Sequence, residues 1–425
     1  MPEPKTLREI SCADDYDPDS MPVDRARELI RQFLNPVTAV ERVHIRQALG
    51  RILGADIVSP IDVPGHDNSA MDGWAVRFAD LSLDGETRLT RIGESFAGKP
   101  FGGALKSGQA VRIFTGAVMP PGADTVVMQE RAKEASGGVT IDAGAVNRLG
   151  QNRRFAGEDL KRGGVVFRAG QRLKPAEIGM MASLGINEIA VYRRLRVAFF
   201  STGDELVAIG QPLEEGQIYD SNRYTLHGML TRLDCEVVDM GVVRDEPEAL
   251  ERAFATAAEN ADVVITSGGV SVGEADFVKQ LLDKLGEVLF WKIAMKPGRP
   301  LAYGRIGNAH FFGLPGNPVS VMVTFYQFVQ DALRILMGQR DVKPLPMFPA
   351  TLAAPIRKAP GRTEFQRGIL SPGADGRWSV RTTGDQGSGI LSSMSQANCF
   401  IVLGAECCNV DAGAIVDVQP LEGLV

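Results

Sequence analysis

The feature of this sequence that most constrains its fold is an alternation of strand-like and helix-like segments after residue 195. Short apolar runs predict five strands, at residues 195–201, 236–243, 262–266, 287–293 and 310–312. Patterns typical of helices lie between most of them, at residues 221–233, 247–259 and 276–285. Strands that alternate with helices form βαβ units, so this part of the chain is expected to be an α/β domain with a parallel sheet.

The rest of the chain follows other patterns. Residues 74–141 alternate short β-like runs with Gly/Pro turns, which predicts a small β domain. Helices are expected at residues 22–34 and 175–184, and a further helix is expected to start near Pro318 and to run to about residue 336. A proline-rich linker, KPLPMFP, then precedes short β runs that predict a second β domain. A length of 425 residues fits two to four domains.

Composition excludes several classes of protein. The net charge of −6 argues against a general nucleic-acid coat, and the longest apolar runs are too short to span a membrane. The start of the chain has no apolar segment typical of a secretory signal. Five cysteines without CxxC spacing favour reduced thiols and a cytoplasmic protein. The four histidines are not paired at ligand spacing, so we expect no histidine-based zinc site.

Polar residues gather where the predicted strands end. Ligands of open α/β sheets bind beyond the carboxyl ends of the strands. The candidate residues in the loops at these ends are Asp204, Glu205, Asp245, Ser267, Gly268, Gly269, Glu274, Asp276, Lys292, Lys296 and Arg299. The turn GLPGNP adds a helix N-terminus with Ser320 in its first turn.

These residue types suit a phosphorylated ligand with a metal ion. Glycines such as Gly268 and Gly269 let backbone N–H groups approach an anion. Carboxylates just beyond them, such as Asp276, would repel a bare phosphate, so a divalent cation such as Mg²⁺ is expected between loop and ligand. Lys292 and Lys296 would bind phosphate or another oxyanion.

Each of these features also has a purely structural interpretation. Asp204–Glu205 and Asp245 are typical of helix starts, lysines are usually solvated, and two adjacent glycines can form a tight turn. Their joint placement after successive strands favours function. The chain contains no GxxxxGK[ST] motif and no GxGxxG after the first strand, so neither a P-loop NTPase nor a Rossmann dinucleotide site is supported.

Further polar candidates lie outside the α/β segment. The stretch DNSAMDG brings Asp67 and Asp72 close together, and it suits either a polar turn or a ligand site. Thr115 in RIFTGA is a weaker candidate. Arg367 in EFQRG and Ser388 in QGSGIL lie in Gly-bounded loops, where an arginine suits an oxyanion, although most such arginines lie on the surface.

Eight motifs in order resemble those of the MoeA/gephyrin E-domain family, the molybdopterin molybdenumtransferases. They are DNSAMDG (67–73), RIFTGA (112–117), AGEDL (156–160), STGDEL (201–206), YDSN (219–222), SGGVSVGEAD (267–276), KPGRP (296–300) and GLPGNPVS (313–320). Arg299 stands where the family often has Lys, and Trp74 where Tyr is common. Both changes keep the charge or the aromatic ring.

The resemblance implies a multidomain α/β and β fold. Its parts are an elongated linking domain (21–55 with 156–185), a small β domain (56–155), an α/β molybdopterin-binding-like domain (186–340) and a C-terminal β-barrel-like domain (341–425). The family forms homodimers with the site at the subunit interface. DNSAMDG of one chain would then face the α/β loops of the other.

The resemblance also implies a reaction. Adenylylated molybdopterin and molybdate would react with release of AMP to give the molybdenum cofactor. Glu205, Asp245 and Asp276 would hold Mg²⁺ and phosphate groups, and Lys292 and Lys296 would offset anionic charge. The other implied site residues are Asp67, Asp72, Thr115, Asp159, Ser267, Gly268, Gly269, Pro297, Ser320, Arg367 and Ser388. Catalysis would rest on positioning and charge stabilisation.

Two other functions fit parts of the chain. A MogA-like molybdopterin adenylyltransferase would need the α/β domain alone, and a non-enzymatic scaffold would bind partner proteins. The additional β domains and DNSAMDG favour the insertion enzyme. Expected partners are a molybdopterin adenylyltransferase and the enzymes that receive the cofactor, with no role for nucleic acid or a membrane.

Overall fold

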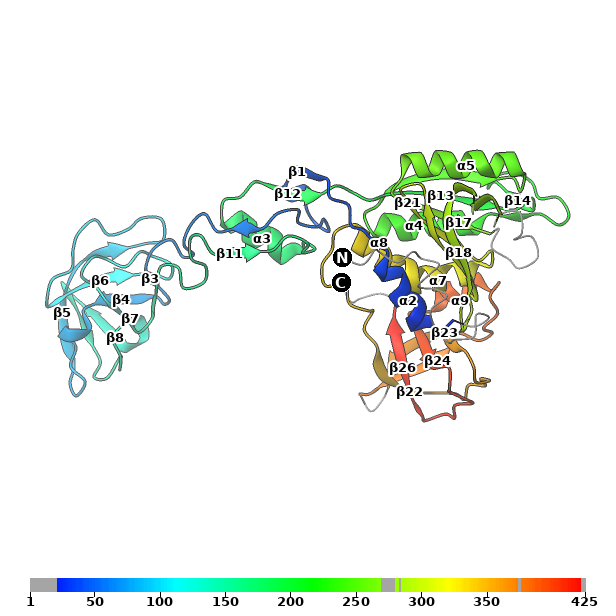
Figure 1. Cartoon of the computed structure of the whole chain (residues 1–425). Coiled ribbons are helices and arrows are strands. Elements are labelled where there is room, and N and C mark those ends of the chain that lie inside the picture. Colours follow the sequence, from blue (N-terminus) through cyan, green and yellow to red (C-terminus); the bar gives the residue numbers. More distant parts are fainter. Residues whose placement is uncertain (1–20, 269–279, 283, 374–375, 422–425) are drawn as a thin grey trace, which may run out of the picture. The chain divides into compact units, whose positions relative to one another are not determined.

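The computed structural model describes residues 21–268, 280–282, 284–373 and 376–421. The chain forms two compact units (Figure 1). The first unit comprises Met1–Glu41, Gly50–Gly54 and Ala190–Val425, and the second comprises Arg42–Leu49 and Ala55–Ile189. The chain passes between them in β1 (Val40–His44) and β12 (Glu188–Tyr192), and again on either side of Gly50–Gly54.

A six-stranded sheet forms the centre of the first unit, in the order β16-β13-β17-β21-β20-β18. Its strands are β13 (Arg196–Thr202), β16 (Glu236–Val243), β17 (Val263–Ser267), β18 (Gly286–Lys292), β20 (Pro300–Ile306) and β21 (Ala309–Leu314). The first four strands in this order are parallel, which confirms the prediction of an α/β domain with a parallel sheet.

The sheet differs from the prediction at one edge. Strand β18 was expected as one more parallel strand, but it is antiparallel to β20. Strand β20 was not predicted from the sequence. Strands β20 and β21 form a tight hairpin in which Ile306 pairs with Ala309 across Gly307 and Asn308. A two-residue connection can join only antiparallel strands, so this turn dictates the change of direction.

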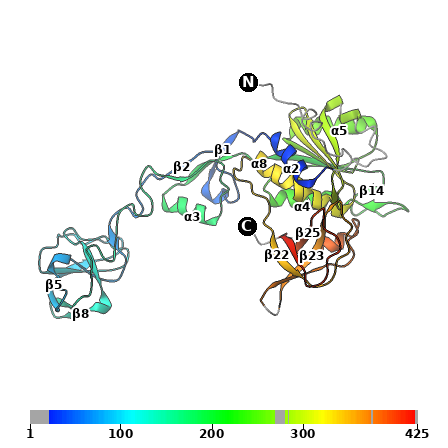
Figure 2. The same cartoon turned by 60° about the horizontal axis from the view of Figure 1, so that its bottom comes forward.

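Helices cover both faces of the sheet, as Figures 1 and 2 show. Alternation along β13 explains the two layers, because Val197 and Phe199 face one core and Ala198 and Phe200 face the other. The first face packs against α2 (Val23–Gln32), α4 (Ser221–Arg232), α7 (Pro318–Thr324) and α8 (Gln330–Leu336), and the second packs against α5 (Pro247–Asn260). A π-helical segment, Phe325–Val329, joins α7 and α8.

These helices match the expected ones, except that the helix expected at residues 276–285 begins outside the described residues. Among the described residues, no helix is long and apolar enough to cross a membrane.

The C-terminal part of the first unit is a β barrel. Its sheet order is β19-β23-β24-β22-β26-β25, and an additional pairing of β23 with β25 closes the barrel. The strands are β19 (Met295–Lys296), β22 (Phe348–Leu352), β23 (Thr363–Pro372), β24 (Trp378–Thr382), β25 (Cys399–Leu403) and β26 (Ile415–Pro420), with α9 (Leu391–Gln396) between β24 and β25. Strand β19 comes from the α/β segment, so the two parts share a sheet.

The second unit contains a six-stranded sheet in the order β7-β4-β6-β5-β9-β8. The strands are β4 (Gly73–Val76), β5 (Thr87–Ser95), β6 (Gln109–Ile113), β7 (Thr125–Met128), β8 (Ala132–Ala135) and β9 (Gly138–Ile141). Trp74 is buried in one of its cores. A Cβ on Gly73 would lie 1.9 Å from the carbonyl oxygen of Val127, so only glycine fits where β4 meets β7.

Small paired strands and one helix make up the rest of the second unit. Strands β2 (Ile57–Val58) and β11 (Val165–Phe167) pair, as do β3 (Asn68–Ser69) and β10 (Arg153–Arg154). Helix α3 spans Pro175–Ser183. Short 3₁₀ turns occupy Ile45–Gln47, Phe78–Asp80 and Gln129–Arg131, and the first unit adds the strand pair β14 (Leu206–Val207) and β15 (Ile218–Tyr219).

Candidate functional site

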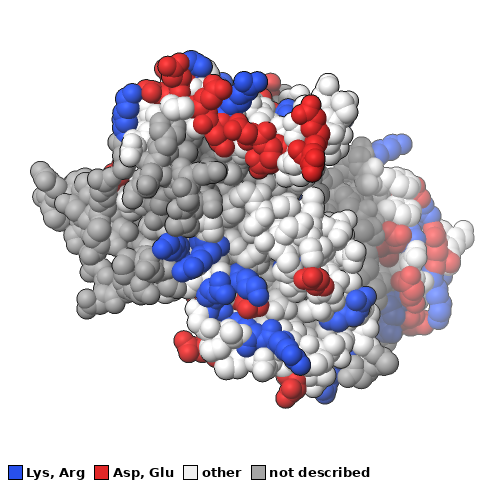
Figure 3. All heavy atoms as spheres, turned by 90° about the vertical axis from the view of Figure 1, so that its right-hand side faces the viewer, with Lys and Arg blue, Asp and Glu red and all other residues white. Residues whose placement is uncertain are grey.

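A cavity of about 810 Å³ lies beyond the carboxyl ends of β13, β17 and β21. Ligands bind at this edge in open α/β sheets because the strand-end loops converge there. The cavity is lined by nine of the residues that the sequence singled out: Glu205, Asp245, Ser267, Gly268, Lys296, Pro297, Arg299, Ser320 and Ser388. Figure 3 shows a group of lysine and arginine side chains near the middle of one side of the molecule, with a few acidic side chains beside and among them.

The other expected residues fall into three groups. Asp204, Lys292 and Arg367 belong to the first unit and are absent from the described lining of the cavity. Asp67, Asp72, Thr115 and Asp159 belong to the second unit. Gly269, Glu274 and Asp276 lie outside the described residues.

Gly268 gives the cavity its shape at the end of β17. Its φ is +92°, and a Cβ there would lie 2.6 Å from the carbonyl oxygen of Thr202, so a larger residue would push β13 and β17 apart. Its N–H donates to the carbonyl oxygen of Leu314 over 3.1 Å. Gly268 therefore provides close packing rather than the anion-binding N–H that the sequence suggested.

Hydrogen bonds of Asn222 order the part of the cavity lining beside Gly268. The side-chain amide of Asn222 donates to Ser267 Oγ at 2.9 Å and to the carbonyl oxygen of Gly316 at 2.6 Å. A carbonyl only accepts, so these bonds fix which end of the Asn222 amide is nitrogen. Within the described chain, the buried Asn222 Oδ1, Asp220 Oδ2 and Thr202 Oγ1 have no hydrogen-bond partner. Three buried oxygen atoms of cavity-lining residues therefore lack a partner within the described chain.

The start of α7 forms another part of the cavity lining. Pro318 occupies its first position, and Ser320 in the first turn is 4% exposed. The N–H of Val319 donates to the carbonyl oxygen of Ser388 at 3.1 Å. This bond connects α7 to the barrel loop, which is the loop between β24 and α9. Gly298 in the KPGRP turn packs so closely that a Cβ would lie 2.5 Å from Thr324 Oγ1. Two serine hydroxyls and the KPGRP turn are thus held in one small region.

Arg367 lies behind the cavity wall, fully buried. Its Nε donates to Ser393 Oγ at 3.0 Å, and a terminal nitrogen donates to the carbonyl oxygen of Gly387 at 3.0 Å. Burial lowers the pKa of its guanidinium, and the charge of Asp385 opposes this. In this conformation Arg367 holds the loop that carries Ser388.

The cavity offers oxygen donors of the kind that Mg²⁺ prefers. Glu205 and Asp245 provide carboxylates, and Asp220 and Asn222 add further oxygen atoms. In the described ranges, no group of three His, Cys, Asp or Glu side chains is arranged around one point.

The expected residues of the second unit form hydrogen-bonded pairs. Asp72 accepts bonds from the N–H and the hydroxyl of Thr115, and both residues are exposed. Asp67 accepts a bond from the N–H of Ala156 at 2.7 Å and pairs with Arg153. Burial raises the pKa of Asp67, but these two donors outweigh burial and hold it below the ordinary value.

Asp159, the fourth of these residues, is exposed, and its N–H donates to the carbonyl oxygen of Val63 at 3.0 Å.

Sequence reasoning missed three residues of the cavity region. Asp220 caps α4 through a bond from the N–H of Arg223 at 3.1 Å, and an Asp before a helical pattern signals such a cap. Asn222 follows it in YDSN. Glu364 contacts Lys296 from β23, a strand that is distant in sequence, so no local pattern could have revealed this contact.

Three family models match successive parts of the chain. They are the MoeA N-terminal region (domains I and II) over residues 21–185, a probable molybdopterin binding domain over residues 198–335, and the MoeA C-terminal region (domain IV) over residues 349–421. Together they span most of the described chain.

Known proteins resemble the chain over nearly its whole length. It is 48% identical over 403 residues to a molybdopterin molybdenumtransferase of Haemophilus influenzae, covering 95% of this chain and 99% of that protein. It is 36% identical to molybdopterin molybdenumtransferase 2 of Mycobacterium tuberculosis, covering 89% and 94%. The crystal structure of a molybdopterin biosynthesis MoeA protein from Pyrococcus horikoshii has a TM-score of 0.82 at 30% identity, covering 95% of this chain and 100% of that one.

Proposed function

Because the chain belongs to the MoeA family of molybdopterin molybdenumtransferases, we propose that molybdenum enters molybdopterin in the cavity of its first unit. The protein is an enzyme of molybdenum cofactor biosynthesis that inserts molybdenum into molybdopterin. The location is supported by the convergence of nine expected residues at the carboxyl edge of the parallel strands.

Molybdopterin reaches the cavity in adenylylated form. Water cleaves the phosphoanhydride and AMP leaves. The two dithiolene sulfurs then replace one oxygen of molybdate, which takes up the two thiol protons and leaves as water. Lys296, Arg299 and Arg362 line the cavity and offset the charge of phosphate groups and oxyanion. The chemistry needs no protein nucleophile, so the residues act by holding charged groups in place.

The molybdate oxyanion is placed between α7 and the barrel loop. Ser320 and Ser388 line the cavity on adjoining segments, and their hydroxyls donate to oxyanion oxygens. Lys296 adds a positive charge from β19. Arg367 acts through Gly387, since it holds the loop of Ser388.

Mg²⁺ accompanies the adenylylated substrate. When bound, it would neutralise phosphate charge and polarise the phosphoanhydride. Glu205 and Asp245 would hold it with water molecules, and Asp276 is expected to contribute as well. Asp220 lies in the same lining and carries a buried oxygen without a partner in the described chain.

The working form is a homodimer. The cavity is built from the first unit, whereas Asp67, Asp72, Thr115 and Asp159 belong to the second. In a dimer the second unit of one chain would complete the site of the other. Deleting the second unit would then abolish turnover, and mixing this variant with one lacking Lys296 would show whether activity needs residues from both chains.

The same reaction defines the partners. A molybdopterin adenylyltransferase would supply the substrate, and molybdenum-dependent enzymes would accept the product. The protein is expected to work in the cytoplasm, where thiols stay reduced, and its four described cysteines are unpaired.

Purified protein supplied with adenylylated molybdopterin, molybdate and Mg²⁺ tests this function. AMP and active cofactor should appear together, and omission of Mg²⁺ should slow both. Adenylylation of molybdopterin from ATP without insertion of molybdenum would instead identify an adenylyltransferase. Failure to form either product would reject both enzyme assignments.

A further inference from the structure

We infer that Glu364, a buried carboxylate of the C-terminal barrel, is a positioning residue that holds Lys296 at the cavity. Lys296 lines the cavity, and Glu364 lies beneath it on β23. The inference rests on the proposed function of this cavity and assigns a role to a residue outside its lining.

The backbone register brings the two residues together. Strand β19 pairs in parallel with β23, with Met295 opposite Thr363 and Lys296 opposite Glu364. The N–H of Thr363 donates to the carbonyl oxygen of Ala294 at 2.9 Å, which extends this pairing by one residue. Neighbouring residues on paired strands carry side chains on the same face, so the register itself sets Glu364 beside Lys296.

The ion pair is asymmetric in its exposure. Lys296 Nζ lies 3.7 Å from Glu364 Oε1, and the lysine side chain is 52% exposed whereas the glutamate side chain is 9% exposed. The other carboxylate oxygen, Oε2, accepts a hydrogen bond from Gln366 Nε2 at 2.8 Å. Gln366 therefore holds one carboxylate oxygen of Glu364. The negative charge lies beside Lys296, the cation that β19 contributes to the cavity lining.

A purely structural role explains this arrangement poorly. Burying a carboxylate is costly, and well-packed apolar side chains often stabilise a core as well as a buried ion pair does. A lysine side chain has four rotatable bonds, and an oxyanion that recruits a free lysine must restrict them. An ion pair with Glu364 restricts these rotations before the substrate arrives, and the N–H groups of the ammonium remain available to the oxyanion.

Loss of the Glu364 charge and loss of its contact with Lys296 should change the reaction in opposite directions. Removing the negative charge of Glu364 makes the cavity more positive, which by itself would strengthen oxyanion binding. Removing the anchor leaves Lys296 mobile, which should slow the chemical step. Glu364→Gln keeps the shape and the contact with Gln366, so it separates these two effects.

The first test is a double-mutant cycle with Glu364→Gln and Lys296→Ala in the homodimeric enzyme. Glu364→Gln should lower kcat about tenfold, with a smaller change in KM for molybdate, and the double variant should be no slower than Lys296→Ala alone within about twofold. Additive losses, or a lower KM with unchanged kcat, would overturn the proposal. Glu406→Gln removes an exposed carboxylate from the same part of the chain and should leave the rate unchanged.

The second test does not depend on activity. Reductive dimethylation with ¹³C keeps lysine charged and gives each lysine an NMR signal, and loss of one signal in Lys296→Arg assigns Lys296. Its relaxation should report a restrained side chain in the native chain and a mobile one in Glu364→Gln. Equal mobility in both would overturn the proposal even if turnover is normal.

Glu364→Asp provides a second test if the glutamine variant folds poorly. It keeps the charge but shortens the side chain by one methylene, so Lys296 should become partly mobile and kcat should fall less than in Glu364→Gln. A fully native rate with a mobile Lys296 would reject positioning as the cause.

Discussion

Asp72 accepts two hydrogen bonds from Thr115, one from the backbone N–H and one from the hydroxyl, each 2.8 Å long between donor and acceptor. The pair joins DNSAMDG to RIFTGA, two segments that the sequence singled out separately. The backbone bond, together with the hydroxyl bond, holds the pKa of Asp72 below its ordinary value. Asp72 therefore stays ionised at neutral pH although its side chain is exposed.

Thr115→Val should raise the pKa of Asp72, because the hydroxyl bond is lost while the backbone bond remains. A ¹³C NMR titration of the Asp72 carboxyl group measures this directly. Thr140→Val removes a hydroxyl from β9 in the same unit and should leave the titration unchanged. A titration midpoint for Asp72 that is the same in native protein and Thr115→Val would show that the hydroxyl bond does not form.

Arg367→Lys should weaken both folding and molybdate binding. Lysine cannot donate to Ser393 and Gly387 at once in the geometry of the guanidinium, so the free energy of unfolding should fall by about 2 kcal/mol. The loosened loop would displace Ser388 and raise KM for molybdate. Urea unfolding and steady-state kinetics measure the two effects.

Ser388→Ala is the matched comparison for Arg367→Lys. It should raise KM for molybdate with little loss of stability, because it removes one hydroxyl from the cavity. The double variant should have a KM close to that of Ser388→Ala. A KM effect of Arg367→Lys that persists undiminished in the Ser388→Ala background would mean that Arg367 contacts the oxyanion itself.

His310 should make the protein less stable in mild acid. Burial lowers its pKa from 6.5 to about 4, and the nearby charge of Arg305 acts in the same direction. Below pH 6.5 the unfolded chain binds a proton at His310 that the folded chain does not bind until about pH 4. Stability should therefore fall across this window, by up to ~3 kcal/mol.

Urea unfolding at pH 7 and pH 4.5 tests this account of His310. His310→Phe keeps a ring beside Tyr303 and removes the titrating group, so the variant should lose less stability on acidification than the native chain. The comparison cancels the titration of carboxylates that both proteins share. An identical loss in both proteins would show that His310 is not the source.

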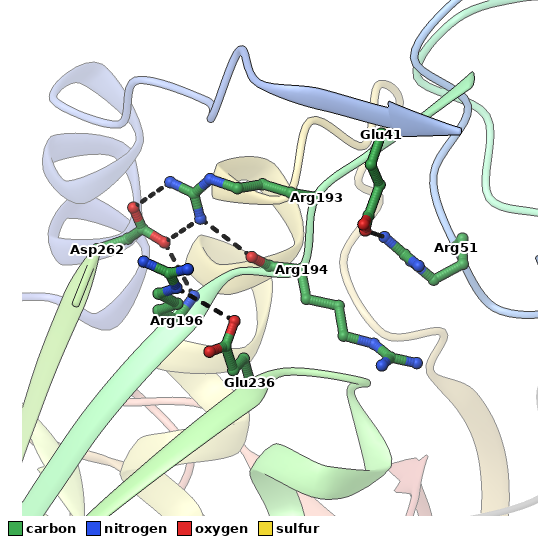
Figure 4. Close-up of polar contacts among 7 residues, drawn as sticks. All are labelled: Glu41, Arg51, Arg193, Arg194, Arg196, Glu236 and Asp262. Atoms are coloured by element: carbon green, nitrogen blue, oxygen red, sulfur yellow. Dashed lines mark hydrogen bonds and ion pairs between the residues drawn. The ribbon is translucent and has the colours of Figure 1, made fainter. Parts of the chain in front are cut away.

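Asp262 anchors the edge of the sheet opposite the cavity. Arg193 donates to its two oxygen atoms at 2.6 and 2.7 Å, and the N–H of Arg196 adds a bond of 2.8 Å (Figure 4). Burial raises the pKa of Asp262, but these bonds outweigh burial and lower it overall. Asp262→Asn should reduce the free energy of unfolding by ~2 kcal/mol, a value reduced for partial exposure.

The pair Arg196–Glu236 is the control for Asp262→Asn. Its atoms lie 3.1 Å apart, but both side chains are about half exposed, so Glu236→Gln should cost less than ~0.5 kcal/mol. Because the Asp262 pKa is lowered in the folded state, its contribution is complete above the ordinary pKa and disappears as the pH falls through the folded value. Equal costs for the two variants would contradict the assigned difference in burial.

Local patterns were enough to predict the parallel strands and a second β domain, whereas the barrel was expected only from the family resemblance. The runs that became β13, β16 and β17 are β-branched and apolar, and their period of two places Val197 and Ala198 in opposite cores. The hairpin of β20 and β21 was not predicted, because Pro300 and the nearby glycines are unfavourable in strands. Pairing with neighbouring strands overrides these weak local preferences.

The site was predicted as a set of motifs rather than as a geometry. Strand-end loops converge by topology, so the cavity could be foreseen from Glu205, Asp245, Ser267 and Lys296. The burial of Arg367 and the contact of Glu364 with Lys296 could not, because both depend on how the barrel packs against the α/β segment. Such contacts arise between residues far apart in sequence.

The most direct test of this account is the yield of molybdenum and AMP from one reaction of the purified protein. With adenylylated molybdopterin, molybdate and Mg²⁺, native protein should incorporate molybdenum in amounts equal to the AMP released. Ser320→Trp, which fills the cavity at the start of α7, should do neither while remaining folded. Full molybdenum insertion by Ser320→Trp would contradict the claim that this cavity is where the metal enters molybdopterin.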